Sequence, residues 1–343
     1  MTDRARATIR DVATLSGLSI CTVSRALRGL PNVSLDAQKR IEDAAEKLGY
    51  RASSAASRLA GGRTGQVAII APKATSWFFA EAVEAAEEVF ADSGLDTVLV
   101  SLRGQGKVRD RLFDDPTEFS QRVDGVLLFG VNLDASQVEA LSESRLAVAS
   151  VGLEGVPWDN VGIDDEAAAW AATRHLLDLG HWDLAMLAGS EPSHGTVTTA
   201  AQRRAGFERA LDEEHLEPDP DMMVSAPSTI DGGYQAMTEL ISTRRVPGAV
   251  FAGCDEAAFG ALKAMREHGL SAPKKVSLIG IDDHPMSSFL GLTTVAQPVP
   301  DQGAFAATLL AERLQNHDDG GAPHDHRLPT PLIERKTTRR SRH

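Results

Sequence analysis

The apolar residues near the start of the chain recur at the spacing of two short helices. They are Ile9, Val12, Ala13 and Leu15 in the first helix, and Ile20, Val23, Ala26 and Leu27 in the second. Gly17 lies between the two sets and can take the positive φ of a tight turn, and Ser19 is placed to cap the second helix. The pattern predicts a helix-turn-helix between Thr8 and Arg28.

The second of these helices presents a short polar and basic surface on the side away from its partner. The residues on that side are Ile20, Cys21, Thr22, Ser24, Arg25 and Arg28. Such a surface is typical of a helix that enters the major groove of DNA. The alternative is a small helical hairpin that binds no nucleic acid, because Ala, Gly and Val are common residues.

A third helix is predicted from Leu35 to Leu48, with Ser34 as its cap and Gly49 suited to a left-handed end. Residues 52–60, flanked by 50–51 and 61–65, are too few and too polar to be stable as an isolated helix, yet they permit a helix if a partner supplies the packing. A plain flexible linker is the alternative for this segment.

From Gln66 onward, strands and helices alternate. Buried parallel strands are predicted at 67–70, 97–100, 125–129, 146–151, 184–187, 248–251 and 276–281, and helices at 79–92, 166–179, 200–214, 233–243 and 256–269. This alternation is typical of doubly wound α/β sheets with helices on both faces. Roughly 280 residues exceed one such sheet, so we expect two lobes with a ligand cleft at the carboxyl ends of their strands.

The basic residues of the chain are concentrated at its N-terminal end. The 343 residues are 42% hydrophobic and 24% charged, which is ordinary for a globular protein, and the formal net charge is −13. Residues 1–64 hold eleven Lys and Arg against six Asp and Glu, a formal charge of +5, so the remainder carries −18. The N-terminal part is therefore the part suited to nucleic acid.

Cysteine usage and hydropathy indicate a cytoplasmic protein. Cys21 and Cys254 are too few for a disulfide framework or a cysteine zinc site, and they fit a reducing compartment. The N-terminus has no apolar signal core, and no apolar run approaches the ~20 residues of a membrane span. No membrane partner is expected.

Motifs of catalysis and of cofactor binding are missing from the sequence. It has no glycine-rich phosphate loop of P-loop or Rossmann spacing, no Gly-x-Ser-x-Gly elbow and no zinc motif among its ten histidines. His317, His324 and His326 fall in a predicted surface loop, where a chance solvated cluster is expected rather than a metal site. We therefore predict no enzymatic activity, no cofactor and no metal.

A series of motifs runs in one order along nearly the whole chain: TIRDVATLSGLSICTVSRAL, SRLAGG, NVGIDDEAAAWAATRHLLDLGH, RRAGF, GCDEAAFGALKAMREHGL, KVSLIGIDD, LTTVAQP and LIERKTT. In these motifs the chain resembles the LacI/GalR family of bacterial transcription regulators. The helix-turn-helix followed by LAGG is the specific part, since the α/β repeats alone would also suit a periplasmic sugar-binding protein. The resemblance implies a homodimer with paired DNA heads, a hinge helix and a two-lobed sensor like a periplasmic binding protein.

The resemblance also implies how the chain is divided and what it binds. Residues 1–50 would form the DNA-binding domain, 51–64 the hinge helix and linker, and 65–340 the effector-binding and dimerisation domain. The N-terminal lobe of this last domain would comprise 65–161 and 297–322, and the C-terminal lobe 162–296 and 323–337. Family members mostly repress, and the implied partners are double-stranded operator DNA, a second copy of the chain and a small-molecule effector, expected to be a sugar, although nucleosides and purines also occur.

The predicted DNA-binding set is Thr8, Ile20, Cys21, Thr22, Ser24, Arg25, Arg28, Ser34 and Leu59. By resemblance, Arg25 reads a base and can pair with guanine in bidentate fashion, whereas Ile20 and Cys21 would offer apolar contact, for example to a thymine methyl. The hydroxyl residues near helix N-termini look like phosphate contacts. Leu59 matches the hinge leucine that family members wedge into the minor groove, and packing against its twin is the alternative role.

The predicted effector site is Phe78, Phe79, Asp164, Arg203 and Asp255. By resemblance, the two phenylalanines line the cleft from the N-terminal lobe, although a Phe pair at the start of a helix is as often core. Arg203 and Asp255 match an effector-binding arginine and aspartate that would bracket a polyol. Asp164 is either a further cleft residue or the cap of the helix that follows it. Cys254 stands where the family usually has Asn, which leaves the ligand unspecified.

A solute-binding protein with no role at DNA is the rival function. The helix-turn-helix and the missing signal core separate the two. No leucine heptad follows the last strand near Leu332, so nothing in the sequence supports a tetramer over a dimer.

Overall fold

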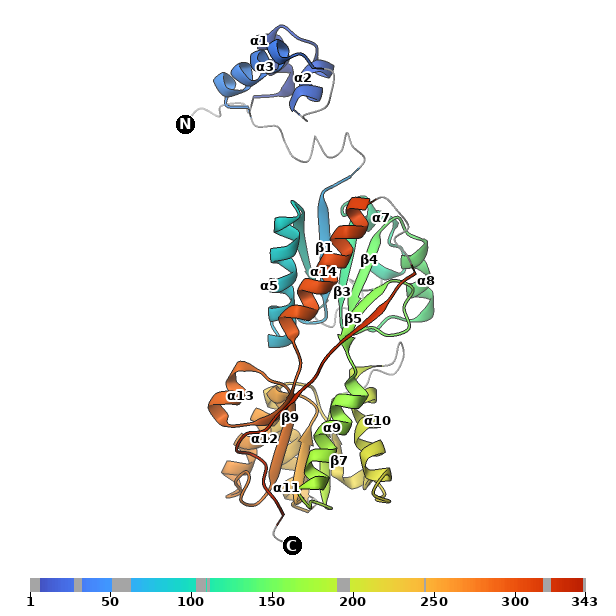
Figure 1. Ribbon diagram of the computed structural model, residues 1–343, viewed down its shortest axis with the longest axis vertical. Coiled ribbons are helices and arrows are strands. Elements are labelled where there is room, and N and C mark those ends of the chain that lie inside the picture. The colour runs from blue at the N-terminus through green and yellow to red at the C-terminus, as the bar shows by residue number, and fades with distance from the viewer. Residues whose placement is uncertain are drawn as a thin grey trace. The chain divides into compact units, whose positions relative to one another are not determined.

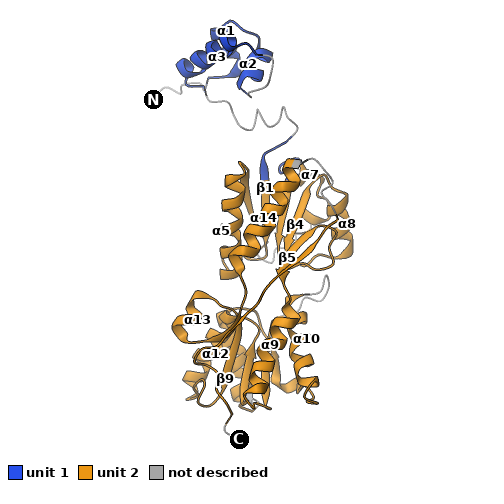
Figure 2. Cartoon of the chain, in the orientation of Figure 1, with its two compact units in different colours: residues 1–66, 121–124 blue, residues 67–120, 125–343 orange. Residues whose placement is uncertain are grey.

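The computed structural model describes residues 7–27, 33–50, 63–102, 109, 112–189, 198–243, 245–316 and 322–341. The chain forms two compact units, residues 1–66 with 121–124 and residues 67–120 with 125–343 (Figure 2). Within the described ranges, no helix is both long enough and apolar enough to cross a membrane.

The first unit has a core of three helices, α1 (Ile9–Ser16), α2 (Ile20–Leu27) and α3 (Leu35–Leu48) (Figure 1). Val12, Val23 and Ile41 come one from each helix and are fully buried in a common cluster. Gly17 follows α1 with a left-handed φ of 69°. Ser19 Oγ accepts a hydrogen bond from the Thr22 amide at 3.1 Å and so caps α2. The predicted helix-turn-helix is confirmed.

The predicted boundaries of α3 are also confirmed. Ser34 Oγ accepts from the Ala37 amide at 3.2 Å, and Gly49 ends the helix with a φ of 59°. One predicted core residue is wrong, because Leu15 is 52% exposed. It lies two residues after Ala13, about 200° round the helix from that buried side chain, and so points outward.

The second unit has two lobes, each built on a six-stranded sheet. In the N-terminal lobe the strand order is β11-β5-β4-β3-β1-β2, and the five strands from β11 to β1 pair in parallel. The elements of this lobe are β1 (Gln66–Ala71), α5 (Trp77–Asp92), β2 (Asp96–Ser101), α7 (Thr117–Ser120), β3 (Gly125–Phe129), α8 (Ala135–Glu143), β4 (Ala147–Val151), β5 (Asp159–Ile163), α14 (Val299–Asn316) and β11 (Asp325–Leu328). Helices α5 and α14 pack on the face that carries Ile69, Leu127 and Phe129.

In the C-terminal lobe the strand order is β12-β10-β9-β8-β6-β7, parallel except for β12. Its elements are α9 (Asp165–Asp178), β6 (Leu184–Ala188), α10 (Thr199–Asp212), the 3-10 helix η1 (Pro220–Met222), β7 (Met223–Ser225), α11 (Ile230–Thr243), β8 (Ala249–Ala252), α12 (Asp255–Glu267), β9 (Ser277–Asp282), α13 (Pro285–Leu290), β10 (Thr293–Ala296) and β12 (Leu332–Ile333).

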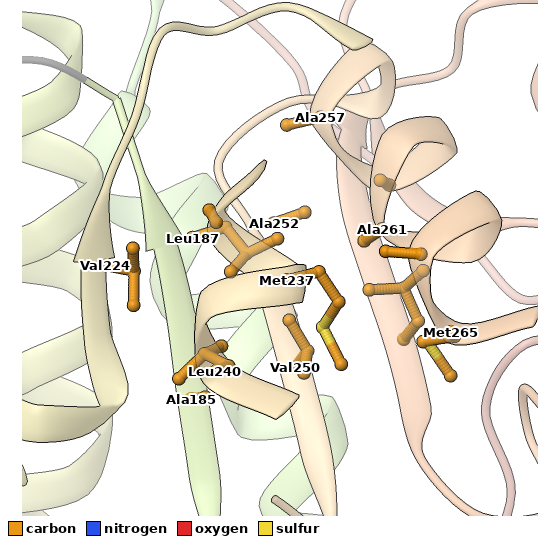
Figure 3. Close-up of a cluster of buried hydrophobic side chains, with 14 of the residues drawn as sticks. Ala185, Leu187, Val224, Met237, Leu240, Val250, Ala252, Ala257, Ala261 and Met265 are labelled. Atoms are coloured by element: carbon orange, nitrogen blue, oxygen red, sulfur yellow. The ribbon is translucent and has the colours of Figure 1, made fainter. Parts of the chain in front are cut away.

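Alternate residues of the C-terminal strands face opposite helical layers. Leu187 and Val250 belong to the cluster formed with α11 and α12, where Met237 and Met265 also lie (Figure 3). Their neighbours along the strands, such as Phe251, face α9 and α10 instead. Helices therefore cover both faces of a parallel sheet, and the predicted doubly wound fold is confirmed.

The chain passes between the two lobes three times (Figure 1). The crossings lie between β5 and α9, between β10 and α14, and between β11 and β12. Because α14 and β11 return to the N-terminal lobe, residues late in the sequence complete the sheet that the early residues begin.

Two predictions about strands and loops are wrong. Strand β2 was expected to be buried, but it lies at the edge of its sheet and Leu99 is 49% exposed. The predicted surface loop around His324 and His326 contains β11, which pairs with β5. The two imidazole rings lie 5.9 Å apart, and His317 lies outside the described residues. Among the residues that are described, no group of three His, Cys, Asp or Glu side chains is arranged to hold a metal ion.

Candidate functional site

The predicted base-reading residues lie on the outer side of α2. Ile20 is 46% exposed, Cys21 is also exposed and Arg25 is half-buried. Val23 is fully buried against α1 and α3, and this contact sets which side of α2 faces outward. The structure thus brings Ile20, Cys21 and Arg25 onto one short helix, and their contact with bases stays a prediction.

Two of the predicted phosphate contacts are caps of helices. Thr8 precedes α1, and its hydroxyl donates to Asp11 Oδ2 at 2.8 Å. Ser34 precedes α3 and caps it through the Ala37 amide. The N-terminus of a helix carries a partial positive charge, so both residues stand where a phosphate would be favoured. A phosphate contact through Thr8 requires its hydroxyl to turn away from Asp11.

The other predicted DNA-binding residues divide between α2 and the undescribed segments. Thr22 and Ser24 are half-buried on α2, and Thr22 Oγ1 lies 2.9 Å from Ser19 Oγ. Arg28 and Leu59 lie outside the described residues, as do 51–62 of the predicted hinge. Their roles stay predictions.

A cavity of about 450 Å³ lies at the carboxyl ends of the strands of both lobes, where the sequence predicted a cleft. Phe78 and Phe79, in the first turn of α5, line it with their rings 5.3 Å apart in an edge-to-face arrangement. Val131 follows β3 and Leu153 follows β4, and both add apolar surface from the same lobe. This half of the cavity is mostly apolar, and the contact of Phe78 and Phe79 with an effector stays a prediction.

The C-terminal lobe supplies charged groups to the same cavity. Arg203 of α10 is buried, its Nε donates to Asp165 Oδ1 at 2.7 Å, and its Nη1 donates to the Gly253 carbonyl. Gly206 allows this pairing, because a Cβ at that position would lie 2.1 Å from the Glu166 carbonyl oxygen at the start of α9. The close approach of α9 and α10 therefore brings Arg203 to Asp165 at the cavity, and its contact with an effector stays a prediction.

The prediction that Asp255 faces the cavity is wrong. Its carboxylate is fully buried outside the described cavity lining and accepts from Ser287 Oγ at 2.6 Å, Thr294 Oγ1 at 2.7 Å and the His284 amide at 3.0 Å. Burial and then the charge of Asp282 raise the pKa of Asp255, and the three donors oppose this. Asp255 therefore joins α12 to α13 and β10 instead of meeting a ligand.

Asp282, at the same edge of the sheet, has a carboxylate that lines the cavity. It ends β9, and its φ of 135° together with a φ of 55° at Asp283 is a strained turn for residues other than glycine. Gln297 Nε2 donates to Asp282 Oδ1 at 2.5 Å, and Gln302 Nε2 donates to Gln297 Oε1 at 3.0 Å. Burial raises the pKa of Asp282 to about 6, while Arg203 lowers it.

Asp164 is a helix cap, which was one of its two predicted roles. Its Oδ1 accepts from the Ala167 amide at 2.8 Å, and its Oδ2 lies 3.2 Å from Arg327. It does not line the cavity among the described residues, whereas its neighbour Asp165 does. The side chain at the start of α9 that meets the cavity is thus one residue later than predicted.

Sequence reasoning missed Asp165, Glu256, Asp282 and Gln297 as cavity residues. For Glu256 and Asp282 the available signal was their position shortly after a predicted strand, whereas the strands before Asp165 and Gln297 were not predicted. Asp282 follows Val276–Ile281 without a gap, and the carboxyl ends of parallel strands meet at one edge of a sheet.

The two cysteines are expected to differ strongly in reactivity. Burial, with the charge of Asp282 adding to it, raises the pKa of the Cys254 thiol to about 12, whereas Cys21 is exposed. Because the thiolate is the reactive form, iodoacetamide at pH 8 should modify Cys21 roughly tenfold or more faster than Cys254. Mass spectrometry of timed samples measures both rates, and equal rates would contradict the buried position of Cys254.

Family models match both parts of the chain. Residues 8–53 match the model of bacterial regulatory proteins of the lacI family. Residues 173–338 match the model of a periplasmic binding protein-like domain.

Relatives cover nearly the whole length. Catabolite control protein A of Priestia megaterium is 32% identical over 316 residues, which are 90% of this chain and 92% of that protein. The chain belongs to the LacI family. Another LacI-family relative, the ribose operon repressor of Halalkalibacterium halodurans, is 31% identical over 337 residues, 97% of each chain. The solved complex of the transcriptional regulator CelR with cellobiose has a TM-score of 0.71 and 28% identity, covering 97% of this chain and 100% of that one.

A LacI-family chain with this helix-turn-helix and this two-lobed sensor is a DNA-binding transcriptional regulator. The predicted family and function are confirmed. The rival function, a solute-binding protein with no role at DNA, leaves the matched N-terminal domain unexplained.

Proposed function

We propose that this LacI-family regulator binds a roughly palindromic operator as a homodimer in the cytoplasm, and that a sugar or related polyol in the cavity weakens operator binding. The observation that carries the proposed effector is the lining of the cavity, with aromatic side chains on one lobe and charged groups on the other. The proposed operator binding rests on the family and on the exposed residues of α2.

On the DNA side, two identical heads related by a two-fold axis need two half-sites in inverted order. Residues 1–50 would read each half-site, and 51–64 would form a hinge that becomes helical on operator, with Leu59 in the minor groove. A footprint on the promoter of the regulator's own operon tests this arrangement. We expect protection of a site with inverted symmetry, and a protected site without it would count against the dimer.

Arg25→Ala is expected to relax specificity at a single base pair of each half-site. Loss of a bidentate pair with guanine should cost about 1–3 kcal/mol at that position. Operator variants titrated against wild type and Arg25→Ala measure the effect. An equal loss of affinity on every sequence would reassign Arg25 to phosphate.

On the effector side, a ligand in the cavity would touch both lobes. The rings of Phe78 and Phe79 suit the C–H faces of a sugar, and Arg203 and Asp282 can bond its hydroxyls. Such a ligand favours the arrangement of the two lobes in which residues of both lobes contact it. The ligand changes operator affinity only to the extent that it binds the operator-binding state and the other state of the regulator with different affinities.

Two of the relatives support a sugar as the effector. One is named for the ribose operon, and another was solved with the sugar cellobiose. A thermal-shift screen of sugars, nucleosides and purines on the full chain is the direct test. We expect the hits among the sugars and related polyols, and hits confined to purines or nucleosides would overturn this part of the proposal.

A further inference from the structure

Among the cavity-lining residues that the structure describes there is one cation, and its charge is already paired. Among the described lining residues the charged side chains are Arg203, Asp165, Glu256 and Asp282. Arg203 pairs with Asp165 at 2.7 Å and also donates to the Gly253 carbonyl. Its remaining N–H groups can still meet a hydroxyl, but its charge is balanced before any ligand enters.

The other two carboxylates leave the described lining of the cavity with an excess of negative charge. Glu256 is half-buried and makes no hydrogen bond or ion pair with the residues that the structure describes. Burial raises its pKa, and of the charged groups around it Lys73 acts in the opposite sense. A carboxylate in this setting is stabilised by a ligand that donates hydrogen bonds and is opposed by one that adds negative charge.

Hydrogen-bond directions make Asp282 an acceptor for the ligand. Gln302 donates to Gln297, and this leaves the Gln297 amide nitrogen to donate to Asp282 Oδ1. The Asp255 amide lies 3.4 Å from Oδ2. The lone pairs of Asp282 that remain can only accept, so they need a hydroxyl or an ammonium group opposite them.

We infer that the cavity admits neutral or cationic effectors rich in hydrogen-bond donors and excludes phosphorylated sugars and sugar acids. This inference rests on the proposed function, since it concerns the same site. A phosphate or carboxylate group on the ligand would be repelled by the carboxylates of the cavity and would find no hydrogen-bond donors on them. Arg203 does not offset this repulsion, because it is already paired with Asp165. We expect an anionic derivative to bind at least tenfold more weakly than its neutral parent, which corresponds to about 1.4 kcal/mol.

The test uses the full chain and a small-molecule extract of the organism that encodes it. A strong anion exchanger at pH 8 divides the extract into an unretained fraction, neutral and cationic, and a salt-eluted anionic fraction, and each desalted fraction is added to the protein in a thermal-shift assay. We expect stabilisation by the unretained fraction. Stabilisation by the anionic fraction alone would overturn the inference while leaving a ligand-controlled regulator in place. No stabilisation by either fraction would contradict the proposed effector, and the inference would fall with it.

A charge-reversal variant tests whether the lining residue sets this selectivity. Glu256→Lys should reduce the discrimination between a neutral ligand and its phosphorylated form by at least tenfold, because it replaces a negative charge in the cavity with a positive one. Glu217→Lys makes the same change of net charge at an exposed residue outside the cavity lining and should leave the discrimination as in wild type. Equal discrimination in wild type and Glu256→Lys would show that Glu256 does not set it.

Discussion

Asp282→Ala is expected to remove most of the effector response at a ligand concentration equal to the wild-type Kd. The substitution removes the buried carboxylate that ends β9 in the cavity, and hydrogen bonds to a charged group contribute about 1.5–3 kcal/mol each. Ligand affinity should therefore fall by roughly tenfold to a hundredfold. Calorimetric titration of the full chain with a hit from the thermal-shift screen measures the loss.

A matched control separates this effect from a general change of charge. Asp212→Ala removes an exposed carboxylate near the end of α10, outside the cavity lining, and should leave ligand affinity unchanged. An Asp282→Ala protein that binds the ligand as tightly as wild type would show that the effector lies elsewhere.

Asp255→Ala is expected to destabilise the sensor instead of acting through ligand contact. The carboxylate receives hydrogen bonds from Ser287, Thr294 and the His284 amide, and its loss leaves these buried donors without their acceptor. Each unsatisfied buried group costs about 1–3 kcal/mol, so we expect the free energy of unfolding to fall by about 2–5 kcal/mol. Urea unfolding followed by tryptophan fluorescence measures the change.

The conservative variant Asp255→Asn keeps one acceptor oxygen and should recover part of the lost stability. An Asp255→Ala protein of unchanged stability that has lost its ligand affinity would contradict this expectation. It would restore the effector-binding role first predicted for Asp255.

Local periodicity was enough to predict the helices of the first unit and most of the sheet strands. The turn at Gly17 and the caps at Ser19 and Ser34 depend on a few neighbouring residues, and the structure has them as predicted. The long helix α14 escaped prediction because Pro298 and Pro300 at its start are typical of loops. Proline is nevertheless compatible with the first turn of a helix, where its missing N–H has no partner to lose.

The cavity was harder to predict than the fold because it depends on where each side chain points. Asp255 and Asp282 both follow strands, so the sequence places them at the same edge of the sheet. The first belongs to α12 and is buried outside the described cavity lining, whereas the second lines the cavity and has a backbone with positive φ. Residue type and spacing do not distinguish these two outcomes. For the same reason the sequence did not show that Asp164 caps α9 whereas Asp165 pairs with Arg203.

The most direct test of the account is operator titration of the full chain with and without a cavity ligand. The operator is the site defined by footprinting, and the ligand is the strongest neutral hit of the thermal-shift screen. We predict that saturating ligand raises the operator Kd at least tenfold, a coupling of about 1.4 kcal/mol, and that Asp282→Ala needs a roughly tenfold to hundredfold higher ligand concentration for the same change. An operator Kd that stays the same in wild type at saturating ligand would contradict control of DNA binding through this cavity.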